Sequence, residues 1–313
     1  MKYRAGMNEA AAPADSITVL FATDLNYLQH AMACIASLLA NNPRRRFEVL
    51  LAGTQDLTPA LPRIQRSFEN ESRLRLRVEK FSPPDGFSYP PHHRFTVEAY
   101  IRFWVAELLP DAHHALYLDP DIIVAADIGP LWNTDLKRKT VAAVPIPGST
   151  RPAVHGFPPG SEYFNSGVML IDLDAWRAHK YREQLLDYLH AHPEAAIDAD
   201  QDILNICLRT DWVPLPYVWN MISPFYFLSH DLKMTQAALD AARRDAKIIH
   251  FNGDSKPWSY FSRHPRREEY WKYLRMTDWR DFRPPDYTPA NVVRKAASRV
   301  IPAPVKRVLK SIL

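Results

Sequence analysis

The chain has 313 residues, 47% of them hydrophobic and 24% charged, with a formal net charge of +4. These proportions are those of a folded globular protein and exclude a disordered or fibrous chain. No stretch approaches about 18 uninterrupted apolar residues, so no membrane-spanning helix is expected. Cys34 and Cys207 lie in separate apolar stretches without metal-ligand spacing, as reduced core cysteines do. The first fifteen residues lack the apolar core of a signal peptide, so we expect a flexible extension and a cytoplasmic protein.

The first half of the chain alternates strands with helices. Apolar runs that end in turn-forming residues predict strands, and apolar residues at helical spacing predict helices. The expected strands are 17–22, 47–52, 74–78 and 115–118, the last continued by 122–124, and the expected helices are 27–39, 61–70 and 96–109. This alternation predicts a mostly parallel sheet with helices on both faces, which binds ligands at the carboxyl ends of its strands.

The second half of the chain is more mixed. Strands are expected at 141–145, at 164–171 with an interruption at Gly167, and at 247–250, and helices at 176–190 and 200–208. No internal repeat and no linker long enough to separate two cores is evident. We therefore expect one Rossmann-like α/β domain over residues 16–284, between the N-terminal extension (1–15) and a basic amphipathic tail (285–313).

An Asp-x-Asp pair directly follows a predicted strand, in the run Tyr117-Leu118-Asp119-Pro120-Asp121. Alternate side chains of an extended backbone point to the same side, so the two carboxylates lie close together and repel unless a cation sits between them. A divalent ion that also binds substrate phosphates is the simplest such cation. The alternative is a pair of solvated loop carboxylates.

The best further metal ligand is His250, at the end of the predicted strand 247–250. A neutral imidazole beside carboxylates suits Mn²⁺ and similar ions, although a lone histidine at a strand end is also common as a structural residue. The segment that follows contains Gly253, which lets a backbone approach a phosphate closely, and Lys256, which supplies a point charge for a diphosphate.

Two polar segments complete the candidate site. Asp200-Gln201-Asp202 begins a predicted helix. Its acids either only interact favourably with the helix dipole or face a sugar and its reacting carbon. Asn165, in a strand of small residues, belongs either to a turn or to a group that binds sugar hydroxyls.

Six short motifs occur in a fixed order along residues 17–260. They are Ala22-Thr23-Asp24-Leu25-Asn26-Tyr27, Tyr100-Ile101-Arg102-Phe103, Tyr117-Leu118-Asp119-Pro120-Asp121, Tyr163-Phe164-Asn165-Ser166-Gly167-Val168-Met169, Asp200-Gln201-Asp202-Ile203-Leu204-Asn205 and His250-Phe251-Asn252-Gly253-Asp254-Ser255-Lys256-Pro257-Trp258. In this order they resemble glycosyltransferase family 8, the retaining enzymes that include bacterial lipopolysaccharide galactosyl- and glucosyltransferases and glycogenin. The resemblance implies a nucleotide-sugar-binding domain of the GT-A type.

The resemblance assigns a nucleotide-binding role to five positions. The backbone near Ala22, together with Asp24 and Asn26, would hold the uracil and ribose of a UDP-sugar. Gly253 and Lys256 would contact the diphosphate.

The same resemblance assigns the metal and the sugar. Asp119, Asp121 and His250 would bind Mn²⁺, or Mg²⁺, bridging the two phosphates. The donor sugar would be surrounded by four polar side chains: Arg102, Asn165, Asp200 and Gln201.

Two positions depart from the family's pattern. Leu25 stands where many members carry a second Asp, and Pro120 is an unusual residue between the metal carboxylates. Neither departure removes a ligand. Proline lacks an N–H, so it puts in doubt any backbone contact donated from position 120.

The expected catalytic residues are Gln201 and Asp200. A double displacement requires a carboxylate beside the anomeric carbon, whereas the resemblance locates Gln201 there, and an amide is a poor nucleophile. We therefore expect a front-face attack in which the departing phosphate is the base and Gln201 stabilises the sugar cation. An isolable glycosyl adduct on Asp200 or Asp202 would contradict this hypothesis.

The tail carries most of the positive charge. From residue 285 to 313 there are six basic residues and one acid, Asp286, and apolar residues recur at helical spacing over 292–301 and 305–313. This pattern predicts a basic amphipathic segment that contacts an anionic membrane surface. The alternatives are a helix packed on the domain or a nucleic-acid-binding tail, and we expect no nucleic-acid partner.

Together these features predict a metal-dependent retaining hexosyltransferase. It would move galactose or glucose from a UDP-sugar to a glycan or glycolipid acceptor, a lipopolysaccharide or cell-envelope precursor, at the inner face of the cytoplasmic membrane. Two alternatives stay open. One is glycogenin-like self-glucosylation, which needs one of the 14 tyrosines to reach the site; the other is a nucleotide-sugar-binding protein without turnover.

Overall fold

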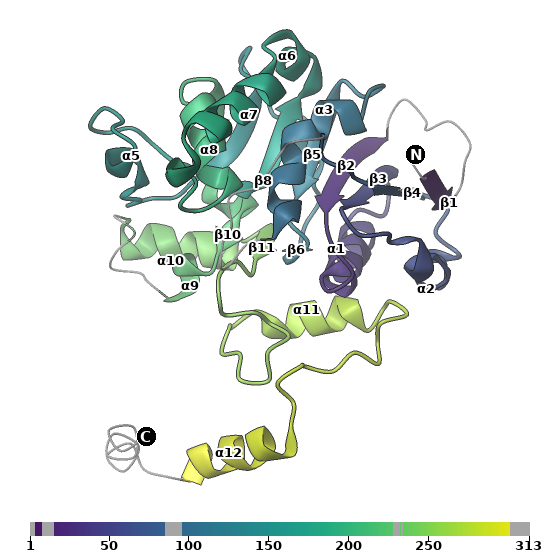
Figure 1. Ribbon diagram of the computed structural model, residues 1–313. Coiled ribbons are helices and arrows are strands. Elements are labelled where there is room, and N and C mark those ends of the chain that lie inside the picture. Colours follow the sequence, from purple (N-terminus) through teal and green to yellow (C-terminus); the bar gives the residue numbers. More distant parts are fainter. Residues whose placement is uncertain (1–3, 8–15, 85–95, 228–231, 233, 301–313) are drawn as a thin grey trace.

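The computed structural model describes residues 4–7, 16–84, 96–227, 232 and 234–300. Its centre is an eight-stranded sheet in the order β1-β4-β3-β2-β5-β8-β7-β9 (Figure 1). The strands are β1 (Arg4–Met7), β2 (Ile17–Ala22), β3 (Phe47–Gly53), β4 (Leu74–Lys80), β5 (His114–Leu118), β7 (Val141–Pro145), β8 (Phe164–Asp172) and β9 (Trp212–Pro214). The block β4-β3-β2-β5 is parallel, and β8 runs antiparallel to both β5 and β7. The expected α/β class with a mixed, mostly parallel sheet is confirmed.

The central strands are buried on both faces, which explains their uninterrupted apolar runs. In β2, Ile17, Val19 and Phe21 belong to one hydrophobic core, while Leu20 and Ala22 belong to a second core on the opposite face. Because side chains alternate along a strand, each six-residue run supplies both cores.

Helices cover both faces of the sheet (Figure 1). The first core includes residues of α1 (Leu28–Asn41), α2 (Leu61–Phe68), α10 (Gln236–Arg244), α11 (Arg267–Leu274) and a small second sheet of β10 (Met221–Ile222), β11 (Ile248–His250) and β6 (Ile122–Val124). The second core includes residues of the 3₁₀-helix η2 (Val97–Trp104) and of α3 (Val105–Leu108), α6 (Leu173–Ala178), α7 (Tyr181–Ala191) and α8 (Asp200–Cys207). Short elements connect these: η1 (Thr58–Ala60), α4 (Gly129–Trp132), α5 (Arg151–Val154), η3 (Pro193–Ala195), η4 (Tyr217–Trp219) and α9 (Pro224–Phe227).

The expectation that 122–124 continues the preceding strand is wrong. The chain turns after Leu118, and β6 pairs antiparallel with β11 in the second sheet. The turn is where Asp119 and Asp121 lie, so the two carboxylates stand at the junction between the two sheets. A run of apolar residues on either side of a turn looks continuous in the sequence, although its two halves pair with different partners.

Two expected helices are also divided. The helix expected at 176–190 is split into α6 and α7 at Lys180, whose φ of 55° is left-handed. The helix expected at 96–109 begins as η2, a 3₁₀-helix, and only its last turn, α3, is α-helical. Within the N-terminal segment expected to be flexible, residues 4–7 form β1, which pairs antiparallel with β4.

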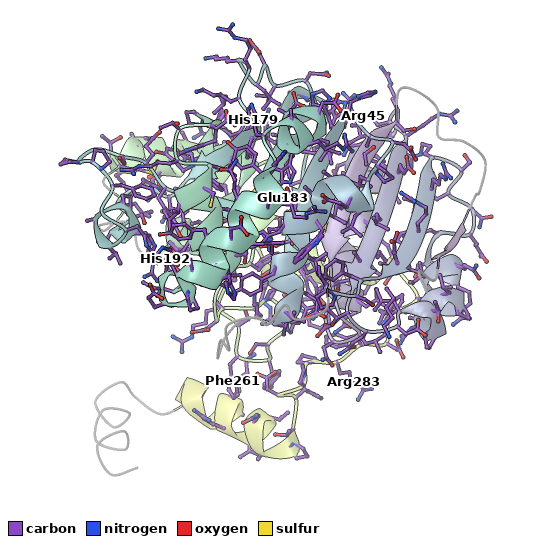
Figure 2. All side chains as sticks on the ribbon, turned by 45° about the horizontal axis from the view of Figure 1, so that its top comes forward. Arg45, His179, Glu183, His192, Phe261 and Arg283 are labelled. Carbon is purple, nitrogen blue, oxygen red and sulfur yellow. The ribbon has the colours of Figure 1, made fainter. Side chains whose placement is uncertain are left out.

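The last helix, α12 (Pro289–Val300), stands apart from the sheet in Figure 1. Phe261 lies where the body of the protein faces α12 (Figure 2), and the guanidinium of Arg294 stacks 5.3 Å from the centre of its ring. The ammonium of Lys295 lies 4.0 Å from the ring centre of Tyr260 and donates to that residue's carbonyl. The remainder of the expected tail, 301–313, lies outside the described residues. Among the described segments, no helix is long and apolar enough to cross a bilayer.

Candidate active site

A cleft of about 700 Å³ opens at the carboxyl ends of β2 and β5, neighbouring parallel strands. Residues that follow the two strands therefore meet at one edge, as in other open α/β sheets. Because β8 is antiparallel to β5, its first residues lie at that same edge. Eleven of the twelve expected site residues line the cleft: Ala22, Asp24, Arg102, Asp119, Asp121, Asn165, Asp200, Gln201, His250, Gly253 and Lys256.

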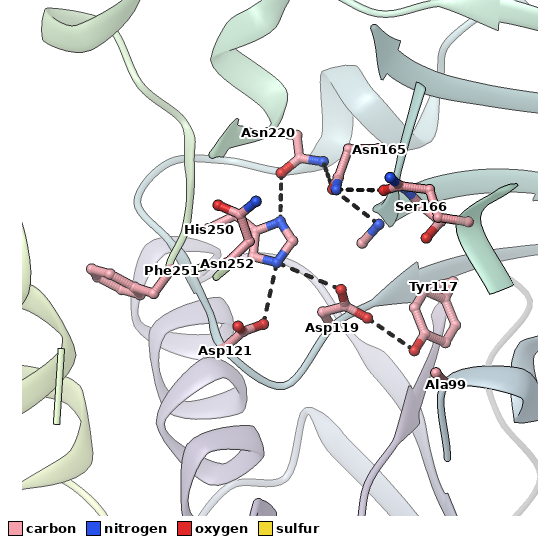
Figure 3. Close-up of polar contacts among 12 residues, drawn as sticks. Ala99, Tyr117, Asp119, Asp121, Asn165, Ser166, Asn220, His250, Phe251 and Asn252 are labelled. Carbon is pink, nitrogen blue, oxygen red and sulfur yellow. Dashed lines mark hydrogen bonds and ion pairs between the residues drawn. The ribbon is translucent and has the colours of Figure 1, made fainter. Parts of the chain in front are cut away.

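Asp119, Asp121 and His250 converge in this cleft (Figure 3). The Nε2 atom of His250 lies 3.2 Å from Oδ1 of Asp121 and 3.5 Å from Oδ2 of Asp119. One ligand atom from each residue falls within 4.8 Å of the others. Two carboxylate oxygens and one imidazole nitrogen form a donor set that suits Mn²⁺ or a similar divalent ion.

Backbone hydrogen bonds on both sides hold the turn that carries Asp119 and Asp121 in place. The N–H of Asp119 donates to the carbonyl of Gly167 (2.8 Å), and the N–H of Phe251 donates to the carbonyl of Asp121 (2.9 Å). Pro120 lies between these two contacts. A Cβ atom at Gly167 would stand 2.3 Å from Cε1 of His250 and 2.5 Å from Oδ2 of Asp119. A glycine is therefore required there, which explains the small residue in the middle of β8.

Lys256 neutralises part of this negative charge. Its ammonium donates to Oδ2 of Asp121 and to the carbonyl of Phe251 (3.0 Å). Burial pushes the pKa of Asp121 upward, but the charge of Lys256 prevails and, with the contact to His250, holds that pKa well below its usual range. Asp121 is therefore an ionised carboxylate at every physiological pH.

Arg102 connects Asp119 to Asp200 across the cleft. Its guanidinium donates to Oδ1 of Asp119 (3.0 Å) and lies 3.1 Å from Oδ2 of Asp200. Its Nη1 donates to the carbonyl (2.7 Å) and the hydroxyl (3.0 Å) of Ser166, and its Nε donates to the carbonyl of Ala99 (2.9 Å). The guanidinium also stacks 4.1 Å from the ring centre of Tyr117. With a side chain only 5% exposed, Arg102 is a fixed charge and cannot swing freely into the cleft.

Asp200 and Gln201 begin α8 and face the cleft. Burial raises the pKa of Asp200 to about 7; the charge of Arg102 opposes this effect and that of Asp119 adds to it. The Gln201 Oε1 atom accepts from Nδ2 of Asn165 (2.8 Å) and from the N–H of Ser166 (3.2 Å). All four expected sugar-binding side chains are therefore joined: Arg102 contacts Asp200, Asn165 contacts Gln201, and Ser166 bonds to both pairs.

Asp202 differs from its two neighbours in α8. Its side chain is fully buried, and it accepts hydrogen bonds from the hydroxyl of Tyr163 (2.7 Å) and the N–H of Asp198 (2.5 Å). Nε2 of His155 lies 2.6 Å from the same carboxylate. Asp202 is not among the residues that line the cleft, so of the two acids in this motif only Asp200 faces it.

Not all of the expected nucleotide-binding residues line the cleft. Asp24 lines the cleft and accepts from the N–H of Tyr27 (2.8 Å). Asn26 is exposed outside the cleft lining, and its Nδ2 donates to Oδ2 of Asp24 (3.4 Å). On the other side, Gly253 has a φ of 71°, a left-handed conformation that glycine adopts without strain.

Two residues that sequence reasoning did not assign to the site are bonded to it: Tyr163, whose hydroxyl accepts from Gln201 (3.4 Å), and Asn220. Asn220 is buried, and its amide lies between Asn165 and His250 (Figure 3). It lies between η4 and the two-residue strand β10, so no periodicity or spacing marks it in the sequence. Only the pairing of β10 with β11 brings it beside His250.

The fold and the site together define a transferase of the GT-A class. The solved structure of the galactosyltransferase LgtC in complex with donor and acceptor sugar analogues matches 85% of this chain and 99% of its own, with a TM-score of 0.71 and 24% identity. Residues 18–262 match the model of glycosyl transferase family 8, and the chain belongs to that family. The resemblance read from the six motifs is confirmed, and the enzyme is a retaining hexosyltransferase.

Three similar curated bacterial proteins align over most of their own length. General stress protein A of Bacillus subtilis is 29% identical over 83% of this chain and 94% of its own. The lipopolysaccharide 1,2-glucosyltransferase of Escherichia coli is 25% identical over 87% and 81%. The lipopolysaccharide 1,3-galactosyltransferase of Salmonella typhimurium is 25% identical over 85% and 80%.

Proposed function

We propose that this protein transfers galactose or glucose from a UDP-hexose to a glycan acceptor with the help of a divalent metal ion. The observation that carries the proposal is the convergence of Asp119, Asp121 and His250 in the cleft that Asp200 and Gln201 also line. A metal site and a sugar-side carboxylate in one cleft are what a reaction needs when it separates a sugar cation from a diphosphate.

Asp119, Asp121 and His250 hold the ion in this proposal. When bound, Mn²⁺ or Mg²⁺ supplies a Lewis acid that neutralises the charge developing on the departing diphosphate. Lys256 supports the same charge from the other side, and its ammonium exchanges Asp121 for a phosphate oxygen when the donor enters. Asp24 and the backbone at Ala22 contact the nucleoside, with Asn26 at the rim, and Gly253 lets the backbone approach the diphosphate.

The sugar is held by Arg102, Asn165, Asp200 and Gln201. The Oε1 atom of Gln201 already accepts from Asn165 and Ser166, so both of its lone pairs are used. Gln201 would therefore stabilise positive charge on the sugar through the dipole of its carbonyl group. We retain the front-face mechanism, in which the departing phosphate takes the acceptor's proton. The burial of Asp202 supports it, because this removes one of the two carboxylates that a covalent intermediate could use.

The deciding experiment measures UDP release from UDP-galactose and UDP-glucose, with Mn²⁺ and with EDTA. We expect release that requires the metal and is faster with one of the two sugars. The proposal fails if neither donor is hydrolysed or transferred with Mn²⁺, or if EDTA makes no difference.

Intact mass of the protein after the reaction tests self-glucosylation, for which Tyr27 at the cleft is the first candidate. An added hexose would make the protein its own acceptor.

For the acceptor, we propose a lipopolysaccharide or other cell-envelope precursor on the cytoplasmic side of the membrane. Two of the similar curated proteins carry lipopolysaccharide transferase names and align over about four-fifths of their length. Transfer of radiolabelled hexose to truncated lipopolysaccharide, compared with transfer to free lactose, tests this assignment. Labelling of lactose alone would contradict it.

We propose that the tail brings the enzyme to an anionic membrane surface. The segment from 287 to 313 contains no acid, and the side chain of Val293 on α12 is exposed. Binding of the full chain to phosphatidylglycerol liposomes is compared with binding of a chain truncated after Tyr287. Equal binding by both chains would eliminate this role for the tail.

A further inference from the structure

The ligand His250 is the end of a chain of buried amides. Its Nδ1 atom lies 2.9 Å from Oδ1 of Asn220, and Nδ2 of Asn220 donates to Oδ1 of Asn165 (2.8 Å). Asn165 donates in turn to Gln201. Asn220 is 0% exposed and Asn165 is 8% exposed, so water does not replace these partners. The chain therefore runs from Gln201 to the candidate metal ligands, and Figure 3 shows its part from Asn165 through Asn220 to His250.

Two backbone N–H groups fix the direction of every hydrogen bond in this chain. A backbone N–H is always a donor, so Oδ1 of Asn165 must be the atom that accepts from Gly167 (3.1 Å), and Oε1 of Gln201 must be the atom that accepts from Ser166 (3.2 Å). The group of Asn220 that faces Asn165 is then its NH₂. Its carbonyl oxygen consequently faces His250.

The direction of the chain decides the tautomer of the imidazole. Because Oδ1 of Asn220 only accepts, Nδ1 of His250 must carry a hydrogen, and the lone pair of the neutral ring lies on Nε2. Nε2 points at Asp119 and Asp121. A lone pair and two carboxylates directed at one point repel each other unless a cation lies there. The tautomer that the amides impose is the one that binds a metal.

We propose that Asn220 and Asn165 are positioning residues that fix the tautomer and orientation of His250 for the divalent ion and connect that ligand to Gln201. This inference rests on the metal dependence in the proposed function. Outer residues that donate to or accept from a metal-binding histidine commonly contribute about 10- to 100-fold in metal affinity. Asn220 acts through His250 and does not contact the ion.

The test uses the full-length protein and measures Mn²⁺ binding directly, by electron paramagnetic resonance of free Mn²⁺ and by spin-echo modulation from a coordinated nitrogen. Asn220→Leu removes the acceptor for Nδ1–H. We expect it to weaken Mn²⁺ binding about 10- to 100-fold and to lose the nitrogen modulation, as His250→Ala does. Wild-type affinity and unchanged modulation in Asn220→Leu would overturn the proposal.

Two conservative variants separate the arms of the chain. Asn220→Asp keeps an oxygen for Nδ1–H and loses only the donor to Asn165, so Mn²⁺ binding and the nitrogen signal should persist. Asn165→Asp still accepts from Asn220 but no longer donates to Gln201, so we expect kcat to fall while Mn²⁺ affinity is kept. Asn220→Asp also decides the question if Asn220→Leu fails to fold. If Asn220→Asp binds Mn²⁺ as poorly as His250→Ala, the proposed role of the acceptor oxygen is wrong.

The matched control is Asn42→Leu. Asn42 is another buried amide, which donates to the carbonyl of Leu38 (2.7 Å) and accepts from the N–H of Ile128 (2.8 Å), outside the cleft. It should lower stability without changing Mn²⁺ affinity. A wild-type protein that binds no Mn²⁺ would refute the proposed function itself. A wild type that binds, beside an Asn220→Leu variant that binds equally, refutes only this inference.

Discussion

The two carboxylates Asp121 and Asp200 line the same cleft, are both buried, and have pKa values displaced in opposite directions. Asp121 touches the ammonium of Lys256 and the imidazole of His250, which hold its pKa down against burial. Asp200 is paired with Arg102, which is shared with Asp119, and burial raises its pKa to about 7. Opposite shifts in neighbouring acids indicate different tasks. Here the ionised Asp121 suits a metal ligand, and the readily protonated Asp200 suits contact with sugar hydroxyls.

The strongest test of this division is Asp121→Asn. The variant loses a metal ligand and leaves the buried Lys256 without its anionic partner, so we expect transfer to fall by about 10³-fold and Mn²⁺ binding to be lost. Steady-state kinetics and Mn²⁺ titration measure the two effects. Asp127→Asn is the control, because that carboxylate is 55% exposed and its pair with Arg45 contributes at most about 1 kcal/mol. Metal-dependent transfer by Asp121→Asn at the wild-type rate would end the assignment of Asp121.

The raised pKa of Asp200 is tested by comparing how the stability of wild type and Asp200→Asn depends on pH. The native state keeps the Asp200 proton up to about pH 7, whereas the unfolded chain loses it near its ordinary pKa of 3.8. Native protein therefore binds more protons between these values, and this group makes stability fall as pH rises. Relative to Asp200→Asn, the wild type should lose up to about 4 kcal/mol of unfolding free energy between about pH 4 and about pH 8.

Urea unfolding of the wild type and Asp200→Asn at several pH values measures this difference. Parallel stability curves for the two proteins would show that Asp200 titrates at its ordinary pKa. The contrast with Asp121 would then disappear. A lowered pKa makes the contribution of Asp121 favourable above its unfolded pKa, and that contribution is lost only in strong acid.

Gly167→Ala should damage the metal side alone. The added Cβ would overlap His250 and Asp119, so the ligands must move apart, at a cost of about 1–3 kcal/mol and about tenfold or more in Mn²⁺ affinity. Val168→Ala is the control, since the next side chain of β8 is fully buried in the core on the opposite face. Equal Mn²⁺ affinity in the two variants would show that the turn tolerates a side chain at 167.

The smallest effect is expected outside both sides of the cleft, at α12. Lys295→Ala removes the contact with the ring and carbonyl of Tyr260, and an exposed cation–π contact contributes about 0.5–1 kcal/mol. Amide hydrogen exchange should accelerate in α12, while transfer to a soluble acceptor stays unchanged. A loss of transfer comparable to that of Asp200→Asn would mean that α12 contributes to the cleft.

Much of the site was readable because its residues follow buried strands. Asp24 follows β2, Asp119 follows β5 and His250 ends β11, so strand ends located from apolar runs also locate the ligands. The break between β5 and β6 was missed for the same reason, because apolar residues on both sides of a turn form one run. Lys180 was missed too, since its left-handed φ interrupts a segment whose residues are otherwise helical in spacing.

By itself, the sequence determined the α/β class, the order of the six motifs and the family, and it identified both carboxylates and the imidazole of the candidate metal site. These depend on local patterns, because strand periodicity and residue type are properties of short segments. Only the tertiary structure decided that Asp202 is buried while Asp200 faces the cleft, that Arg102 is shared by two acids, and that Asn220 stands behind His250. Such relations join residues 17 to 98 positions apart, and only the packing of one element on another sets the distance and dielectric between them.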